Sequence, residues 1–374
     1  MIASILGVGT SLFGKQPDLH PAALAWRAVA EALDDAGRPT IDAVYLGTVF
    51  GAPGVAQRVL HSMGITGVPI LTVENACASG TSAFHEGVAA VQHGRFERVL
   101  AVGLEKMTDQ FVGPIVPENT DTEGRAGLAL PALYAMAASR YLAVYDTTER
   151  DLAGVAVKNH ANGSLNQRSQ GRPAPSIGDV LASRMIANPL TLLQCCPLSD
   201  GAAAAVIGPA NASGDHVVGV RASEMRSGGL WDHRSDEAWG FELIRDTAAA
   251  VYERISLGPD DFDVIECHDA FTIGEIVTTE ALGLRPRGEG AALIRDRTTT
   301  LDGPLPVNPS GGLLSRGHPL GATGLAQIAE IVWQLTGRAG DRQIEGARRG
   351  LVETMGGGVS GIDGNACVIV ALER

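Results

Sequence analysis

The expected order of strands and helices in the second half of the chain repeats the order in the first half. Near the N-terminus, a short apolar strand (2–8) precedes a helix over 21–37 and a strand over 42–49. In the second half, a helix over 241–255 is likewise followed by a strand over 262–266. The offset between the two halves is roughly 220 residues. Such repetition favours an internally duplicated fold in which one layered unit occurs twice.

Strands and helices alternate within each half. A strand over 70–73 leads into a cysteine-containing turn, a small-residue helix over 79–93 follows, and a buried strand over 98–103 comes next. This succession is typical of a parallel sheet that is covered by helices. A second small-residue helix over 321–335 and a final strand over 366–372 are expected in the other half. The expected fold class is therefore α/β, built from duplicated βαβ halves.

One long segment interrupts this alternation. Residues from about 108 to 193 contain helical stretches and several prolines, whereas residues 199–207 return to a core strand. We therefore expect a helical loop domain inserted beside the sheet at about 108–193. The expected division is an N-terminal half over 1–215, which includes this insertion, and a C-terminal half over 216–374.

The charge of the chain restricts its partners. With 29 basic and 42 acidic residues the formal net charge is −13, and an acidic surface disfavours both nucleic acid and anionic membranes. No apolar run reaches the ~18 residues that suggest a membrane span, and the first residues lack the basic region of a secretory signal.

The five cysteines show no disulfide or zinc-site spacing. They are expected to be reduced thiols of a cytoplasmic protein.

Cys77 is the first candidate for chemistry. It lies in the segment Glu-Asn-Ala-Cys-Ala-Ser-Gly (74–80), between an expected strand and an expected helix. The free N–H groups and the positive dipole of a helix N-terminus stabilise a thiolate, and Gly80 permits a substrate to approach closely. A single cysteine in an apolar chain is usually structural, but this placement favours a nucleophile.

Two histidines lie in turns that could face a ligand. His318 falls in the Gly-rich segment 317–324, just before an expected helix. A capping residue in a tight turn is the alternative to a general base there, but the flanking glycines favour a backbone that packs against a ligand. His268 follows a strand that ends at Glu266, at the sheet edge where ligands bind in α/β proteins. The position of His268 alone is equally consistent with a ligand-binding residue and with a surface turn. Asp269 is expected to cap the next helix.

A glycine run near the C-terminus supplies backbone amides. Gly356, Gly357 and Gly358 precede the last expected strand, and their N–H groups could form an oxyanion site. The run lacks the Gly-Lys-Ser/Thr ending of a phosphate-binding loop. A flexible turn is the alternative interpretation.

Together these segments resemble the thiolase superfamily over essentially the whole chain. Cys77 in ENACASG matches the nucleophile motif, and His318 in NPSGGLLSRGHPLGATG matches the histidine motif. Ser-Asp-Gly-Ala-Ala at 199–203 matches the end of the inserted region. His-Asp-Ala-Phe at 268–271, with Lys-Asn-His at 158–160, looks like the sterol-carrier-protein type and the archaeal acetyl-CoA acetyltransferase type.

This resemblance implies a five-layered α-β-α-β-α core with a loop domain over the active site. It implies that His318 takes the proton of Cys77, whose thiolate attacks an acyl-CoA to give an acyl-enzyme. The oxyanion would be held by the Cys77 N–H and by Gly357 or Gly358, and an enolate by His268 and His318. Claisen condensation or thiolysis of a 3-ketoacyl-CoA would follow. Coenzyme A thioesters are then substrates, with no permanently bound cofactor and no metal site.

The chain departs from the family pattern at the second acid/base group. Ordinary thiolases carry a second cysteine where this chain has Met355, and sterol-carrier-type enzymes can use a cysteine where it has Ala270. Neither side chain transfers protons, and Cys267 is expected to point away from His268 on its strand. His268 itself could move this proton. The alternatives are an acyltransferase or C–C lyase with a non-CoA or steroid-type acceptor, and a non-catalytic binding subunit.

The resemblance also implies partners. Acyl-CoA is the expected ligand, and a homodimer or homotetramer is the expected assembly. A small zinc-ribbon and OB-fold protein is a further expected partner, as in archaeal-type members. No motif marks the residues that contact coenzyme A; Arg140, Lys158 and Arg168 are candidates by charge alone, with solvated surface positions as the alternative.

Overall fold

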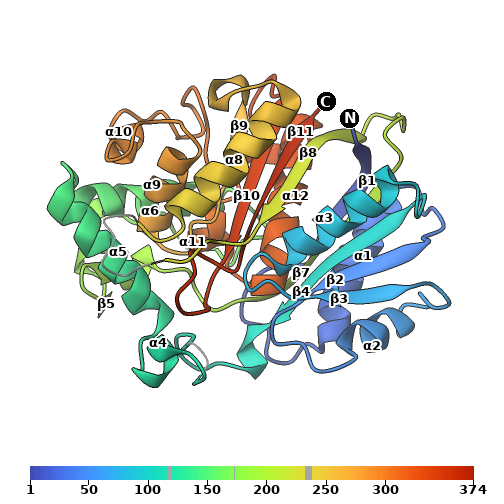
Figure 1. Ribbon diagram of the computed structural model, residues 1–374, viewed down its shortest axis with the longest axis horizontal. Coiled ribbons are helices and arrows are strands. Elements are labelled where there is room, and N and C mark those ends of the chain that lie inside the picture. The colour runs from blue at the N-terminus through green and yellow to red at the C-terminus, as the bar shows by residue number, and fades with distance from the viewer. Residues whose placement is uncertain (117–118, 172, 232–237) are drawn as a thin grey trace.

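The computed structural model describes residues 1–116, 119–171, 173–231 and 238–374, and it shows a large sheet with helices against both faces (Figure 1). The strands of this sheet are β1 (Ala3–Thr10), β2 (Ala43–Gly47), β3 (Ile70–Val73), β4 (Val99–Lys106), β7 (Asp200–Gly208), β8 (Val218–Arg226), β9 (Val264–Glu266), β10 (Arg349–Gly356) and β11 (Ala366–Glu373). Within the described residues, hydrogen bonds join these nine strands in the order β3-β2-β4-β7-β1-β8-β11-β10-β9.

The helices outside the inserted segment form three layers. They are α1 (Pro21–Asp35), α2 (Val55–His61), α3 (Ser79–Gln92), α8 (Phe241–Ile255), α9 (Thr272–Ala281), α10 (Gly290–Arg295), α11 (Gly312–Arg316) and α12 (Leu320–Leu335). Helices α1 and α2 cover the first-half strands, α8 covers the second-half strands with α9 beside it, and α3 and α12 pack together between the two halves. Sheet halves and helices therefore alternate as α-β-α-β-α, which confirms the expected five-layered core.

The duplicated order is visible in the sheet. Outward from the contact between β1 and β8, the order β1-β7-β4-β2 on one side corresponds to β8-β11-β10-β9 on the other. In the first half β3 then pairs with β2, and in the second half Val307 makes a single parallel bridge to Ile265 of β9. Cys77, between β3 and α3, and His318, between Val307 and α12, thus lie in corresponding loops of the two halves.

The sheet is mixed, whereas the strand–helix–strand pattern predicted parallel strands. Strands β2, β3 and β4 are parallel, as are β9 and β10. Strand β7 is antiparallel to β1 and β4, and β11 is antiparallel to β8 and β10. Two strands joined through a crossover helix pair in parallel. Strand β7 instead follows the inserted segment, and β11 follows β10 directly, so neither is constrained to run parallel to its neighbours. The apolar pattern also did not indicate β8 and β10 as strands.

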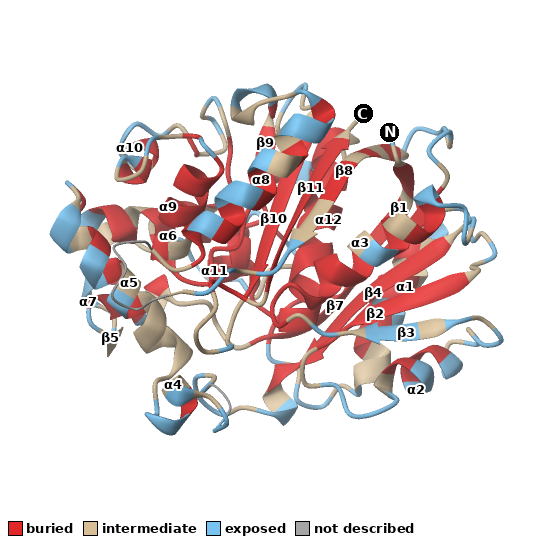
Figure 2. Cartoon of the chain, viewed as in Figure 1, coloured by how far each residue is buried: buried red, intermediate tan, exposed pale blue. Residues whose placement is uncertain are grey.

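Burial follows the layers. Figure 2 shows most strands of the large sheet buried, whereas the edge strand β3, the outer helices and the loops carry exposed residues. The largest cluster of buried apolar side chains lies around α3 and α12, and two further clusters lie beneath α8 and α1. Every residue of α12 is buried, because this helix is enclosed on all sides by the two halves of the sheet.

Glycines let the central helices approach the sheet. A Cβ on Gly103 of β4 would lie 2.2 Å from the carbonyl oxygen of Gly321 in α12, and a Cβ on Gly80 of α3 would lie 2.3 Å from the same oxygen. A Cβ on Gly321 would in turn lie 2.6 Å from the carbonyl oxygen of Gly47 in β2. Only glycine fits such approaches. These four residues, called the glycine joint below, hold the N-terminal ends of α3 and α12 together.

The segment over 108–193 is mainly helical, as expected, and ends in a small two-stranded sheet. Its elements are α4 (Thr122–Arg125), α5 (Leu130–Val144), α6 (Glu149–Ser164), α7 (Ile177–Ala182), β5 (Met185–Ala187) and β6 (Leu190–Thr191). Helix α6 packs against α9 and α11, so the segment is anchored on the second half of the chain. Among the described residues, none of the helices combines the length and apolar character that crossing a bilayer requires.

Candidate active site

Cys77 lies in a tight turn immediately before α3, whose N-cap is Ala78. The preceding residue, Ala76, has a φ of 49°, in the left-handed region that non-glycine residues rarely adopt. The carboxylate of Glu74 accepts the Ala76 N–H at 2.7 Å, and the hydroxyl of Ser79 accepts the N–H of residue 75 at 2.9 Å. These bonds hold the turn in the conformation that places the Cys77 thiol at the wall of a cavity.

The Cys77 thiol is protonated in the resting site. Burial raises its pKa to about 12, and the charge of Glu105 acts in the same direction. The backbone N–H groups of Cys77 and Gly357 lower this pKa, but by less. The backbone N–H groups thus act in the direction expected of a helix N-terminus, but removal from water outweighs them. The thiol needs a base to react.

His318 supplies that base. Its Nε2 lies 3.2 Å from the Cys77 sulfur, and its Nδ1 lies 2.7 Å from the hydroxyl oxygen of Thr323. The Thr323 hydroxyl donates its only proton to the Pro319 carbonyl at 3.0 Å, so it accepts a hydrogen bond from Nδ1–H. Nε2 then carries the lone pair that faces the thiol. Burial holds the pKa of His318 well below its ordinary value, which keeps the ring neutral.

His268 lies beside this pair. Its ring centroid is 5.1 Å from that of His318, at an interplanar angle of 68°. Its Nε2 is buried and has no hydrogen-bond partner among the described residues. Burial lowers the pKa of His268 to about 3, so the ring is neutral and can donate a hydrogen bond to a substrate oxygen. The side-chain N and S atoms of Cys77, His268 and His318 that can bind a metal all lie within 4.8 Å of one another. These three side chains could also hold a zinc ion, although their spacing in the sequence did not indicate a metal site.

The glycine run divides between two sites. The Gly357 N–H stabilises the charged form of the Cys77 sulfur, and Gly357 lines the same cavity. A Cβ on Gly357 would lie 2.2 Å from the Trp239 ring, so a larger residue does not fit. Gly358 lines a separate small space, away from the three reactive side chains. Gly358 does not line the cavity that contains Cys77, and its expected oxyanion role stays a prediction.

The reactive side chains share a cavity of about 570 Å³. Its aromatic wall is formed by Tyr134 of α5, which stacks on Phe271 with ring centroids 4.3 Å apart and meets Trp239 edge-on at 5.5 Å. Two exposed cations, Lys15 and Arg184, line it as well. A mainly apolar wall with a few polar groups is typical of a small-molecule site.

None of the three cations singled out by charge lines this cavity. Lys158 is buried and pairs with Glu275 at 3.0 Å, so it is neither a ligand contact nor a solvated residue. Arg168 pairs with Glu31, and Arg140 is exposed on α5. Among the described residues, Lys15 and Arg184 line the cavity, and no sequence motif marks either of them.

Asp269 caps a different helix from the one expected. Its carboxylate accepts the N–H of Leu313 in α11 at 2.6 Å and the side-chain amide of Asn159 at 2.7 Å. Helix α9, which directly follows Asp269, has no side-chain cap. Asp269 thus ties the turn that carries His268 to the loop that leads to His318, a long-range contact that sequence order could not reveal.

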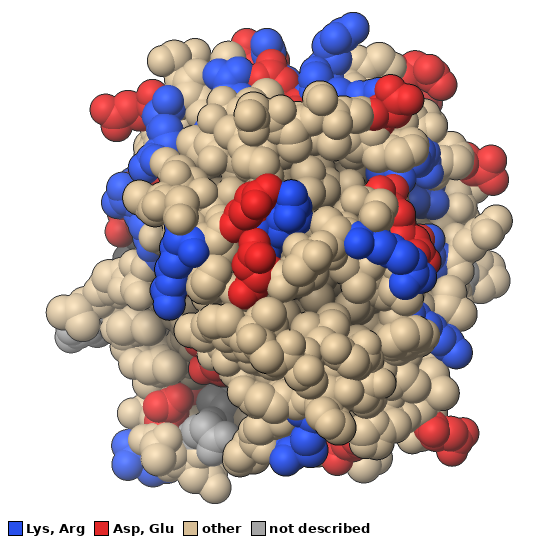
Figure 3. All heavy atoms as spheres, turned by 90° about the vertical axis from the view of Figure 1, so that its right-hand side faces the viewer, with Lys and Arg blue, Asp and Glu red and all other residues tan. Residues whose placement is uncertain are grey.

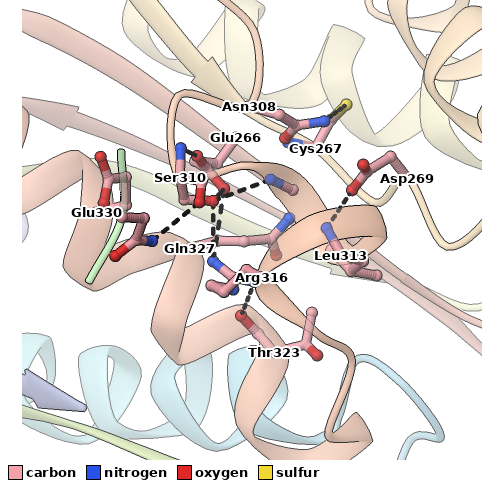
Figure 4. Close-up of polar contacts among 12 residues, drawn as sticks. Glu266, Cys267, Asp269, Asn308, Ser310, Leu313, Arg316, Thr323, Gln327 and Glu330 are labelled. Atoms are coloured by element: carbon pink, nitrogen blue, oxygen red, sulfur yellow. Dashed lines mark hydrogen bonds and ion pairs between the residues drawn. The ribbon is translucent and has the colours of Figure 1, made fainter. Parts of the chain in front are cut away.

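A buried network supports the same loop (Figure 4). Glu266 accepts hydrogen bonds from the N–H and the hydroxyl of Ser310 at 2.9 and 2.8 Å, and it lies 3.6 Å from Arg316. Arg316 also donates to the Thr323 carbonyl at 3.4 Å. Burial raises the pKa of Glu266 to about 7, although Arg316 opposes this shift. The network fixes the residues on both sides of His318.

Glu105 of β4 is a further buried carboxylate at this end of the sheet. It accepts the backbone N–H groups of Val49, Phe50 and Gly321 at 2.8, 3.0 and 3.1 Å. It therefore fastens the end of β2 to the first turn of α12, next to the glycine joint. Burial raises the pKa of Glu105, and these N–H groups oppose the shift.

Comparisons with known proteins agree with this geometry. The family model "Thiolase, N-terminal domain" matches residues 5–172, and "Thiolase C-terminal domain-like" matches residues 230–367. The acetyl-CoA acetyltransferase of Methanothermobacter thermautotrophicus is 40% identical over 367 residues, which cover 95% of this chain and 96% of that protein. Sterol carrier protein 2 of Homo sapiens is 38% identical over 378 residues, which cover 94% of this chain and 69% of that protein.

Solved structures show the same relationship. The Ltp2-ChsH2(DUF35) aldolase matches with a TM-score of 0.82 and 25% sequence identity, covering 100% of this chain and 98% of the other. The family models span well over half of the chain, and the relatives include both types that the sequence resembles. The chain therefore belongs to the thiolase family and is an acyltransferase of that family.

Proposed function

We propose that the chain forms an acyl-enzyme on Cys77 from an acyl-CoA thioester. The acyl group then serves Claisen condensation or, in reverse with free coenzyme A, thiolysis of a 3-ketoacyl-CoA. The observation that carries this proposal is the 3.2 Å contact between His318 Nε2 and the Cys77 sulfur inside the cavity. A buried thiol with a pKa of about 12 is unreactive at neutral pH unless such a base takes its proton.

The site residues have distinct roles in this reaction. His318 accepts the thiol proton as the Cys77 sulfur attacks the carbonyl carbon. The N–H groups of Cys77 and Gly357 stabilise the tetrahedral oxyanion until the thiolate of coenzyme A leaves. Neutral His268 then donates its unpartnered Nε2–H to the carbonyl oxygen of the second acyl group and so stabilises the enolate.

Thiolysis tests this function. Wild-type protein is expected to cleave acetoacetyl-CoA or a longer 3-ketoacyl-CoA when free coenzyme A is added, and Cys77→Ala is expected to be inactive. Consumption of the 3-ketoacyl-CoA is followed by its absorbance. Absence of cleavage and condensation with both short and long substrates would exclude the proposed reaction.

A C–C lyase or acyltransferase with a non-CoA or steroid-type acceptor is the second candidate. Met355 and Ala270 stand where family members carry a second cysteine, and the structural relative Ltp2-ChsH2(DUF35) is described as an aldolase. The close set of Cys77, His268 and His318 argues against a non-catalytic binding subunit.

Arg184 and Lys15 are the proposed contacts for the phosphates of coenzyme A. Arg184→Ala is expected to raise KM for acyl-CoA about fivefold, since an exposed ionic contact contributes about 1 kcal/mol. KM for the matching pantetheine thioester, which lacks the nucleotide phosphates, should not change. Arg140→Ala, an exposed arginine outside the cavity, is the matched control. Equal effects of the two substitutions on KM for acyl-CoA would contradict the assignment.

The acylation rate should resist mild acid. His318 must be neutral to act as a base, and burial, together with the nearby positive charge of Arg316, lowers its pKa. The rate should therefore stay level as the pH falls to about 6.5 and decline only below it. Single-turnover acylation between about pH 5 and pH 8 measures this dependence. An acid limb centred above about pH 7 would contradict the assignment of a buried, neutral His318 as the base.

A homodimer or homotetramer is the proposed assembly. Strand β3 forms one edge of the sheet in the described chain, and its residues Leu71 and Thr72 are exposed. Figure 3 views the molecule from the side on which β3 lies in Figure 1 and shows a broad area without charged residues. An unpaired edge strand can add a strand from a second copy.

Three further expectations remain proposals. A small zinc-ribbon and OB-fold protein is a proposed partner, supported by the likeness to the Ltp2-ChsH2(DUF35) assembly. A cytoplasmic location is supported by five cysteines that are all free. The division into 1–215, with its insertion at about 108–193, and 216–374 is supported by family models that match 5–172 and 230–367.

A further inference from the structure

The proposed Claisen chemistry needs a second group that moves the proton of the α-carbon, and the usual positions hold none. Met355 is buried on β10 opposite Cys367, and Ala270 offers only a methyl group. Cys267 is fully buried, with its sulfur 3.4 Å from the side-chain amide of Asn308, and it does not line the cavity. The proton is then moved either by His268, to which the proposed function already assigns the enolate oxygen, or by a residue that the family motifs do not mark.

Cys196 lies against the position that Ala270 leaves open. Cys195 forms an antiparallel bridge with Phe271, and the Cys196 N–H donates to the Ala270 carbonyl at 2.9 Å. In this register Cys196 stands directly opposite Ala270. Opposed residues of antiparallel strands direct their side chains to the same face, with Cβ atoms about 5 Å apart. A thiol from the segment before β7 thus reaches the space beside position 270.

The cavity wall contains both Cys196 and Cys77, together with His268 and His318. Removal from water raises the pKa of Cys196 well above its ordinary value, and negative charges on Cys195 and Cys77 act in the same direction. The neighbouring Cys195 differs: its sulfur lies 3.3 Å from the Thr191 carbonyl, and its pKa is raised to about 12 by burial alone. Both cysteines line the cavity, but the bridge between Cys195 and Phe271 places the Cys196 side chain, and not that of Cys195, on the same face as Ala270.

We propose that Cys196 is the second catalytic thiol of this enzyme and transfers the proton of the substrate α-carbon. The inference rests on the proposed function and deepens it. His268 is left free to hold the enolate oxygen through Nε2, so one ring does not have to perform both tasks. Glu353, the buried carboxylate that accepts the His268 backbone N–H at 2.9 Å, does not line the cavity and cannot touch the substrate.

The proton and electron movements balance. In acylation, the Cys77 sulfur bonds to the carbonyl carbon, the bond from that carbon to the sulfur of coenzyme A breaks, and the departing thiolate takes the proton of Cys196. The Cys196 thiolate then removes a proton from the α-carbon of a second acyl-CoA. The electron pair of that C–H bond forms the new C–C bond to the acyl carbon on Cys77. The Cys77 thiolate leaves and recovers its proton from His318, so no oxidant or reductant is consumed.

Exchange of the α-proton tests the proposal directly. Proteins are incubated in D₂O with acetyl-CoA, and deuterium in the acetyl group and the mass of the Cys77 peptide are both measured. Cys196→Ala is expected to form the acyl adduct on Cys77 more slowly, because water must then protonate the departing thiolate, and to lose α-proton exchange by about 10²- to 10⁴-fold. Cys196→Ser, which preserves the side-chain volume more closely, should lose exchange as well. Cys195→Ala is the matched control and should keep both adduct and exchange.

A rescue variant separates proton transfer from a structural role. Because positions 196 and 270 stand opposite each other, Ala270→Cys in the Cys196→Ala protein returns a thiol to the same face. This double variant is expected to recover a measurable part of the exchange rate. Recovery would not follow if Cys196 served only to pack the wall.

The outcomes distinguish this inference from the proposed function. If both Cys196 variants exchange the α-proton at the wild-type rate, the role of Cys196 is wrong. It is also wrong if Tyr134→Phe loses exchange and Cys196→Ala does not. Neither result would affect the proposed acylation of Cys77. Absence of any Cys77 adduct in the wild type would remove the proposed function itself. An adduct without exchange or thiolysis in the wild type would remove the Claisen reaction, and the role of Cys196 with it.

Discussion

Replacing His318 with asparagine is expected to slow acylation of Cys77 by about 10²- to 10⁴-fold at neutral pH. The buried thiol, with a pKa of about 12, has almost no thiolate of its own. His318 Nε2 accepts its proton over 3.2 Å, and the bond from Nδ1–H to Thr323 fixes the ring in the tautomer that leaves Nε2 free. An asparagine amide has no comparable basic nitrogen.

Stopped-flow acylation with a chromogenic thioester, or rapid quench followed by mass spectrometry, measures this loss. His85→Asn is the control, since His85 is another half-buried histidine and bonds to Ser223 at 2.9 Å outside the cavity. The defect of His318→Asn should shrink as the pH rises, because thiolate then forms without a base. Acylation of His318→Asn at the wild-type rate would contradict the role of His318.

Gly103→Ala is expected to lower the free energy of unfolding by about 3 kcal/mol. The added Cβ would lie 2.2 Å from the Gly321 carbonyl oxygen and 2.9 Å from the Cα of residue 322. Both atoms belong to the backbone of α12, so the clash is relieved only if that helix moves off the sheet. Movement of α12 would also shift the preceding loop with His318, so acylation should slow in the protein that remains folded.

Urea denaturation gives the size of this effect from the midpoint at an unchanged m-value. Gly229→Ala is the control, because a Cβ there would have no atom within 4 Å. We expect a clearly lower midpoint for Gly103→Ala and a nearly unchanged one for Gly229→Ala. Equal midpoints for the two variants would show that the glycine joint does not limit the approach of α12.

The sequence was sufficient to identify residues whose position depends on local structure. Cys77 and His318 each lie in a Gly-containing turn before a helix, and the duplicated order of elements predicts that these turns correspond. His268 was found through the end of its strand at Glu266. Each of these signals arises from residues within one strand–turn–helix unit, where periodicity and turn chemistry are informative.

Features that depend on contacts between distant segments could not be predicted. The pKa of Cys77 is set by burial, which outweighs the effect expected from the helix N-terminus. Asp269 caps α11 instead of the helix that follows it, and Lys158 forms a buried ion pair. The proximity of Cys196 to Ala270 depends on the register between two loops that are more than 70 residues apart in sequence.

The central claim is that Cys77 carries the acyl group, and intact-protein and peptide mass spectrometry after incubation with acyl-CoA tests it most directly. We expect a mass increase equal to one acyl group, located on the peptide that contains Cys77, in the wild-type protein. Cys77→Ala should show no such increase, and free coenzyme A should remove the group from the wild type. No adduct with several acyl-CoAs, or an adduct that persists in Cys77→Ala, would contradict this account.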